Sequence, residues 1–117
     1  MRIGIDLDGC AFDLRYTKII ELFLTGNEIF IVSAHNKTYY EKDKKLWEHL
    51  YKVQPKEFHY LEGYELVGEF KRRKCKELQL DILIDDFGGN NPKVLGTFLE
   101  NGYPDTAVLM ILGGEGK

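Results

Sequence analysis

Two aspartates, Asp6 and Asp8, directly follow the first apolar stretch of the chain, in the sequence MRIGIDLDG. A serine, Ser33, and an acidic pair, Asp85 and Asp86, follow two later apolar runs. Buried carboxylates are unfavourable unless they are neutralised, and clustered carboxylates also repel one another. Oxygen ligands without a histidine or cysteine cluster favour a hard cation, which points to Mg²⁺. Carboxylates, a metal ion and a hydroxyl together predict a phosphoryl-transfer site.

The segments between these positions predict alternating strands and helices. Short apolar runs of the kind found in buried strands cover residues 2–7, 28–32, 81–84 and 106–112, with a weaker run at 57–61. Apolar residues at helical spacing predict four helices, over residues 16–24, 39–51, 67–78 and 94–99. The first helix should bury Tyr16, Ile19, Ile20, Phe23 and Leu24, and Gly102 should close the last one. The pattern predicts one α/β domain over residues 1–117, three-layered and doubly wound (Rossmann-like), with a mostly parallel five-stranded sheet.

The polar residues of interest stand where predicted strands end. Ligands of doubly wound folds bind beyond the carboxyl ends of the strands. A surface turn at Asp8-Gly9 would explain the first pair of aspartates alone. It would have to recur after three strands to explain Ser33 and the acidic pair as well. The sequence therefore favours one functional site at this edge of the sheet.

The motifs resemble those of haloacid dehalogenase (HAD) superfamily phosphatases, over nearly the whole chain and in the family's order. The family's Asp-x-Asp-Gly motif after an apolar strand is matched by IGIDLDGCAFD, and its strand ending in Ser or Thr by IFIVSAHN. Its lysine at a helix start and its strand ending in paired acids are matched by EFKRRKCKELQLDILIDD. We expect Lys71 to be that lysine, with Lys74 as the alternative.

The resemblance implies a HAD-type fold and a role for each matched residue. Asp6 would be the nucleophile that forms an aspartyl-phosphate, and Asp8 would protonate the leaving oxygen and then activate water. Ser33 and the lysine would contact the phosphoryl group. Mg²⁺ would be held by Asp6, by the backbone carbonyl of Asp8 and by Asp85, with Asp86 supporting it directly or through water.

The chain departs from the family pattern in three places. Cys10 stands where many members have Thr or Val, and we expect it, like Cys75, to pack rather than react. After Ser33 the chain has Ala34-His35-Asn36 where nucleotidases and polynucleotide phosphatases often have Gly or Ala followed by Arg. His35 could line the pocket or be an ordinary packing or surface histidine. Only 24 residues separate Asp8 from Ser33 and 37 separate Ser33 from Lys71, too few for a cap domain, so the resemblance is to the capless branch.

Two other functions fit parts of the sequence. A receiver domain has a similar length, an acidic pocket and a lysine, although its acidic pair should follow the first strand and its lysine the fifth. Here GGEGK follows the last predicted strand. A HAD-fold binding protein without catalysis is the other alternative.

Composition bears on the compartment and the substrate. The chain has no apolar stretch long enough to span a membrane and no signal-peptide pattern, and its two cysteines form no disulfide framework. We therefore expect a cytoplasmic protein without a membrane partner.

Residues 35–76 hold eleven Lys and Arg against seven Asp and Glu, a net charge of +4, interleaved with aromatic residues. Aromatic side chains stack on bases and lysines contact phosphates. This favours a nucleotide or a nucleic-acid terminal phosphate as substrate, recognised by the rim of the site or by a second subunit of a homo-oligomer.

Overall fold

Five parallel strands form the centre of the computed structural model, which describes residues 1–100 and 105–112. The sheet order is β3-β2-β1-β4-β5, and every pair of neighbours is parallel. The strands are β1 (Arg2–Ile5), β2 (Glu28–Ser33), β3 (Glu57–Tyr60), β4 (Ile82–Asp85) and β5 (Ala107–Met110). This order confirms the predicted doubly wound α/β fold. The chain runs outward from β1 in one direction and then returns to β4 on the other side, so the switch point lies between β1 and β4.

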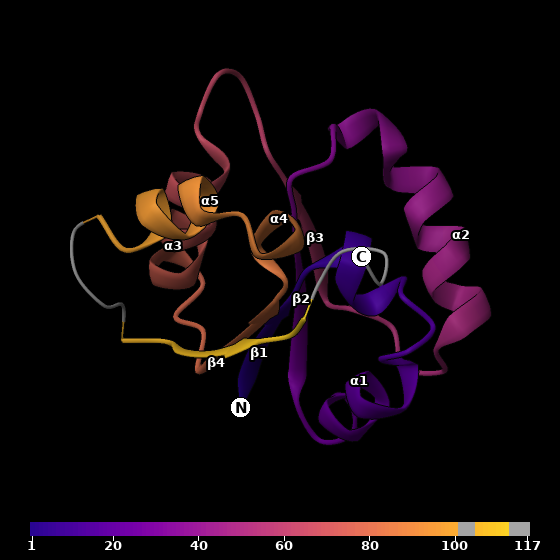
Figure 1. The fold of residues 1–117 in the computed structure, drawn as a ribbon. Coiled ribbons are helices and arrows are strands. Elements are labelled where there is room, and N and C mark those ends of the chain that lie inside the picture. The colour runs from indigo at the N-terminus through magenta and orange to yellow at the C-terminus, as the bar shows by residue number, and fades with distance from the viewer. Residues whose placement is uncertain (101–104, 113–117) are drawn as a thin grey trace.

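Helices cover both faces of the sheet (Figure 1). On one face, α1 (Thr17–Leu24) and α2 (Tyr40–Leu50) pack over the isoleucines of β1 and β2. On the other face, α3 (Val67–Glu77) and α5 (Pro92–Phe98) bury aromatic and aliphatic side chains against β2 and β4. Alternate residues of the strands point to opposite faces, so continuous apolar runs such as EIFIV supply both cores.

Some element boundaries and one inward position differ from the predictions. β1 ends at Ile5 rather than at residue 7, because the chain turns into the short helical segment η1 (Leu7–Ala11). The prediction that Ile19 faces the core is wrong: its side chain is 44% exposed, while Ile20 and Leu24 take the inward positions. The short segments η2 (Lys37–Tyr39) and α4 (Phe87–Asn90) were not predicted. Gly102, the predicted end of the last helix, lies outside the described residues.

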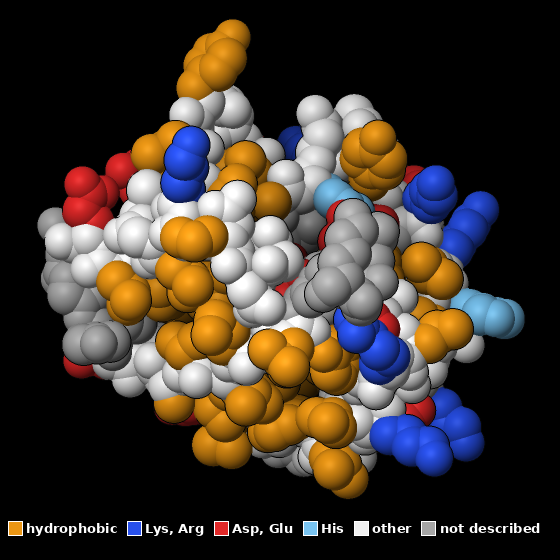
Figure 2. All heavy atoms as spheres, viewed as in Figure 1, with side chains coloured by type: hydrophobic (Ala, Val, Ile, Leu, Met, Phe, Trp, Pro, Cys, Tyr) orange, Lys and Arg blue, Asp and Glu red, His pale blue; other side chains and the backbone are white. Residues whose placement is uncertain are grey.

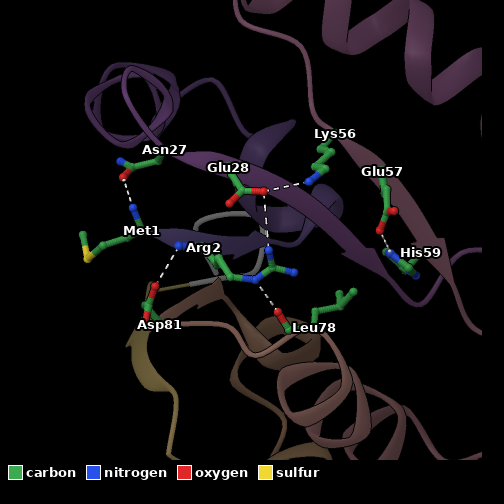
Figure 3. A network of polar contacts seen from close by, with 9 residues as sticks. All are labelled: Met1, Arg2, Asn27, Glu28, Lys56, Glu57, His59, Leu78 and Asp81. Atoms are coloured by element: carbon green, nitrogen blue, oxygen red, sulfur yellow. Dashed lines mark hydrogen bonds and ion pairs between the residues drawn. The ribbon is translucent and has the colours of Figure 1, made fainter.

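Polar contacts tie the strands together at their amino ends (Figure 3). The backbone amide of Arg2 donates to Asp81 at 2.8 Å, and its guanidinium donates to the Leu78 carbonyl at 2.6 Å. Glu28 accepts from Lys56 at 2.8 Å. Exposed pairs of this kind each contribute little free energy, so the stability of the sheet rests mainly on its two buried cores.

The edge strand β5 is the least covered part of the sheet. Val108, Leu109 and Met110 are 40%, 38% and 48% exposed, and apolar side chains gather over this strand in Figure 2. None of the described helices is long and apolar enough to cross a membrane.

Candidate active site

Three carboxylates meet at the switch point of the sheet. Asp6 follows β1, Asp85 ends β4, and Asp86 comes next. One oxygen from each lies within 4.8 Å of the other two, and all three residues are buried. The sequence prediction that these acids converge is confirmed. Carboxylate oxygens at this separation form a donor set that suits a hard divalent cation.

A buried lysine supplies the counter-charge that the structure places beside these acids. Lys71, on α3, is 2% exposed, and its Nζ lies 3.4 Å from Asp6 Oδ1 and 2.5 Å from Asp85 Oδ2. Lys74, the alternative lysine, instead pairs with Glu77 at 3.2 Å. It does not line the cavity that contains Asp6 and Lys71, which is described below. The geometry therefore places Lys71, not Lys74, with the predicted nucleophile.

The single ammonium group of Lys71 does not neutralise the charge of the three buried carboxylates. Burial and the charge of Asp85 raise the pKa of Asp6 well above its ordinary value, against the opposing effect of Lys71. Burial also raises the pKa of Asp85, again opposed by Lys71. Burial disfavours the charged form of Lys71, but Asp6 and Asp85 outweigh this effect and raise its pKa. Among the described residues Asp85 Oδ2 meets no hydrogen-bond donor in good geometry, and its ion pair is with the Lys71 ammonium. A divalent cation would relieve this excess negative charge.

Tight turns hold the acids in place. Asp85 Oδ1 accepts a hydrogen bond from the backbone amide of Phe87 at 2.7 Å, and Asp86 Oδ2 accepts one from Gly89 at 3.1 Å. Gly9 has φ +70°, and a Cβ there would lie 2.1 Å from Asp86 Oδ2. Only glycine therefore allows the turn after β1 to approach Asp86 this closely.

Phe87, in the turn that follows β4, has a strained backbone conformation. It is fully buried and has φ +52°, an uncommon conformation for a side chain of its size. Such strain persists where the surrounding structure holds it and often lies at functional sites.

A cavity of about 840 Å³ opens above the acids. Its lining includes Asp6, Asp8, Ser33, His35 and Lys71, together with the glycines of α4. Ser33 is 1% exposed and its Oγ accepts the backbone amide of His35 at 3.0 Å. The lining of the cavity thus includes carboxylates, a hydroxyl and an ammonium group.

Asp8 is the predicted site residue that lies outside the buried cluster. Its side chain is 68% exposed, and its carboxylate contacts the Nε2 atom of His35. The buried acid group includes Asp6, Asp85 and Asp86 but no side-chain oxygen of Asp8. Asp8 therefore stands at the cavity wall, where a leaving group could reach it.

Sequence reasoning missed the environment of His35. Its Nδ1 lies 3.2 Å from Oδ2 of Asp43, a buried residue of α2 that also accepts a hydrogen bond from Tyr60 at 3.0 Å. A signal was present in the sequence, because Asp43 occupies the inward stripe of the helix between Tyr40 and Trp47. A carboxylate on a buried helical stripe requires partners.

Both cysteines are buried. The Cys10 thiol donates to the Ile84 carbonyl at 3.5 Å, and burial raises its pKa well above the ordinary value. A thiol with a raised pKa is a poor nucleophile. Cys75 is also 2% exposed in the second core, as predicted.

The chain shows no cap over the cavity in its described part. Between Ser33 and Lys71 it forms only η2, α2, β3 and connecting loops before entering α3. Of these, β3 belongs to the sheet and α2 to a helical layer that covers it. The expectation of an uncapped site therefore holds for the described residues.

Comparisons with known proteins add one partial similarity. No protein-family model matches the chain, and no solved structure matches it. Human nardilysin is 34% identical over 83 residues, which cover 64% of this chain. The chain spans about 7% of the length of nardilysin, so the match assigns it neither a family nor an activity.

Proposed function

We propose that this protein is a Mg²⁺-dependent phosphomonoesterase of HAD type that acts through an aspartyl-phosphate on Asp6. The observation that carries the proposal is the position of Asp6, beside two further buried carboxylates and 3.4 Å from Lys71, at the floor of the cavity. A carboxylate so placed can act as a nucleophile if neighbouring cations balance the charge. The order of the sequence motifs supports the same assignment.

The donor set fits the proposed metal. Asp6, Asp85 and Asp86 would hold Mg²⁺ through carboxylate oxygens, and the family resemblance adds the backbone carbonyl of Asp8. When bound, the ion would neutralise charge on the acids and on the phosphoryl oxygens. The three carboxylates gathered around one ammonium group, and the raised pKa of Asp6, support a need for that charge.

The protein residues would then divide the reaction into two steps. An Asp6 oxygen attacks phosphorus, the bond from phosphorus to the leaving oxygen breaks, and Asp8 donates a proton to that oxygen. A water molecule next attacks the phosphorus of the aspartyl-phosphate, Asp8 accepts its proton, and inorganic phosphate leaves with the Asp6 carboxylate restored. Ser33 and Lys71 hold the phosphoryl oxygens throughout.

The observed topology weighs against the receiver-domain alternative. Receiver domains share the order 2-1-3-4-5 of the flavodoxin-like fold, whereas this sheet has the order 3-2-1-4-5. A binding protein without catalysis keeps the same fold and differs only in turnover.

The proposal is tested by measuring the turnover of 4-nitrophenyl phosphate with Mg²⁺. The wild type should hydrolyse it, and Asp6→Asn should lose turnover by about 10⁴-fold or more. Equal turnover by the two proteins would refute it.

We further propose a nucleotide or a phosphorylated nucleic-acid end as the substrate, in a cytoplasmic setting. Tyr39 is 48% exposed and its ring lies 5.3 Å from that of His35 at the cavity wall, so it could stack on a base. Trp47 and Tyr51 are core residues and take no part. Catalytic efficiency on a mononucleotide, a phosphorylated oligonucleotide and a hexose phosphate, compared across a salt series, tests this choice. A best substrate without a base would contradict it.

A further inference from the structure

A chain of polar contacts runs from the sheet edge to the cavity. Tyr60, at the end of β3, donates its hydroxyl proton to Asp43 Oδ2 at 3.0 Å. Asp43 Oδ2 lies 3.2 Å from His35 Nδ1, and His35 Nε2 contacts the carboxylate of Asp8. The contacts thus link β3, α2 and the loop after β2 to the exposed aspartate of the site.

The buried member of this chain is costly to maintain. Asp43 is 4% exposed on the inward face of α2, where an apolar residue would continue the core. Two of its neighbours, His35 and Tyr60, satisfy it with hydrogen bonds. Because an apolar residue would pack here without a desolvation cost, the position of Asp43 suggests a role beyond packing.

The contacts fix the orientation of the His35 ring. The Nδ1 atom of the ring faces Asp43 Oδ2 at 3.2 Å. The opposite nitrogen, Nε2, then faces Asp8. The backbone amide of His35 is also anchored, by its 3.0 Å hydrogen bond to Ser33 Oγ. The ring is therefore held from two sides.

We propose that His35, oriented by Asp43 and Tyr60, is a positioning residue that holds the Asp8 carboxyl group toward the leaving oxygen of the substrate. The inference rests on the proposed phosphatase function. Asp8 is 68% exposed, so without this contact its side chain would sample several rotamers. Proton transfer to the leaving oxygen depends on a donor held within hydrogen-bond reach.

If His35 positions Asp8 for proton donation, its loss should affect substrates with basic leaving groups more than substrates with good leaving groups. Phenyl phosphate has a basic leaving oxygen that needs a proton as its bond to phosphorus breaks, whereas 4-nitrophenolate leaves readily without one. The two substrates share a ring and differ in one nitro group, so recognition is closely matched. The value of kcat/KM reports the transfer of the phosphoryl group to Asp6. Its ratio between phenyl phosphate and 4-nitrophenyl phosphate therefore reports how much protonation of the leaving oxygen assists that step.

The test measures that ratio in variants of the whole chain with Mg²⁺. His35→Ala should lower kcat/KM for phenyl phosphate by about 10- to 100-fold, and for 4-nitrophenyl phosphate by less than about threefold. His35→Gln, whose side-chain amide can both donate and accept a hydrogen bond, should recover most of the loss. Tyr60→Phe and Asp43→Asn should also lower kcat/KM more for phenyl phosphate than for 4-nitrophenyl phosphate, but by a smaller factor. Tyr60→Phe removes only one hydroxyl group. His59→Ala is the matched control, because His59 also contacts a carboxylate, Glu57 at 2.8 Å, and should leave both values unchanged.

The outcomes separate this inference from the function on which it rests. An equal loss for both substrates in His35→Ala, or no loss, overturns the positioning role while wild-type turnover still supports the phosphatase. A wild type that hydrolyses neither substrate overturns the proposed function and the inference together. A selective loss that His35→Gln restores supports both.

Discussion

Replacing Lys71 with methionine should destabilise the metal-free protein by about 3 to 5 kcal/mol, the usual cost of leaving buried charges without their partner. The Lys71 ammonium lies 3.4 Å from Asp6 and 2.5 Å from Asp85, and the side chain is 2% exposed. Methionine retains an unbranched apolar stem, so the change removes mainly the charge. At roughly 4 °C per kcal/mol for a domain of this size, the melting temperature should fall by about 12 to 20 °C.

The loss should depend on pH and on metal. Burial and the charge of Asp85 raise the pKa of Asp6, so acid protonates Asp6 and removes a charge that Lys71 otherwise balances. The Lys71→Met effect should therefore be larger at about pH 8 than at about pH 5. Mg²⁺ should reduce it, because a bound cation replaces part of the missing positive charge. Thermal melts with EDTA or Mg²⁺ at both pH values measure these differences.

Lys74→Met is the matched control on the same helix. Lys74 pairs with the half-exposed Glu77, a contact worth at most about 1 kcal/mol. Turnover should fall by about 10²- to 10³-fold in Lys71→Met and change little in Lys74→Met. If Lys71→Met is as stable and as active as Lys74→Met, the reasoning about the buried lysine is wrong.

Three further predictions concern the metal site, the ionisation of Asp6 and the packing of the helices. Mg²⁺ at a hundred times its dissociation constant should stabilise the wild type by about 2.7 kcal/mol, and Asp85→Asn should abolish this response; a wild-type melt that ignores millimolar Mg²⁺ would count against the site. In EDTA, the raised pKa of Asp6 contributes stability that is present below its unfolded pKa and is lost as pH rises through its folded pKa. Urea midpoints should therefore fall as the pH rises above the ordinary aspartate range, and Asp6→Asn should remove this dependence. Gly68→Ala should cost about 1 to 3 kcal/mol, because a Cβ would lie 2.4 Å from the Val94 carbonyl oxygen of α5. Gly96→Ala, with nothing within 4 Å, should instead stabilise α5 by about 0.5 to 1 kcal/mol, and similar melts for the two alanine variants would contradict the packing.

The alternation of strands and helices could be predicted because parallel strands here are continuous apolar runs and helices carry a clear periodicity. Because ligands of this fold lie beyond the carboxyl ends of the strands, the sequence also predicts that Asp6 and Asp85 lie close together. The position of Lys71 near a helix start predicts its role, and its contacts with Asp6 and Asp85 show that it points to the acids rather than to solvent.

Local geometry could not be predicted in the same way. The turn at Phe87 depends on a positive φ at a bulky residue, which no propensity favours. The contact of Asp43 with His35 and Tyr60 joins three elements, and it depends on how α2 lies against β3. Ile19 shows the limit of periodicity: two adjacent apolar residues share a stripe, and packing decides which one faces inward.

Detection of a phosphoryl group on Asp6 tests the central claim most directly. The wild type is mixed with 4-nitrophenyl phosphate and Mg²⁺ and quenched in acid within one turnover. Borohydride then reduces any aspartyl-phosphate to homoserine, and peptide mass spectrometry locates the change. The account predicts homoserine at position 6 in the wild type and none when substrate is omitted or when Asp6→Asn is used. Steady turnover with Asp6 unmodified, or with the label on another residue, would contradict it.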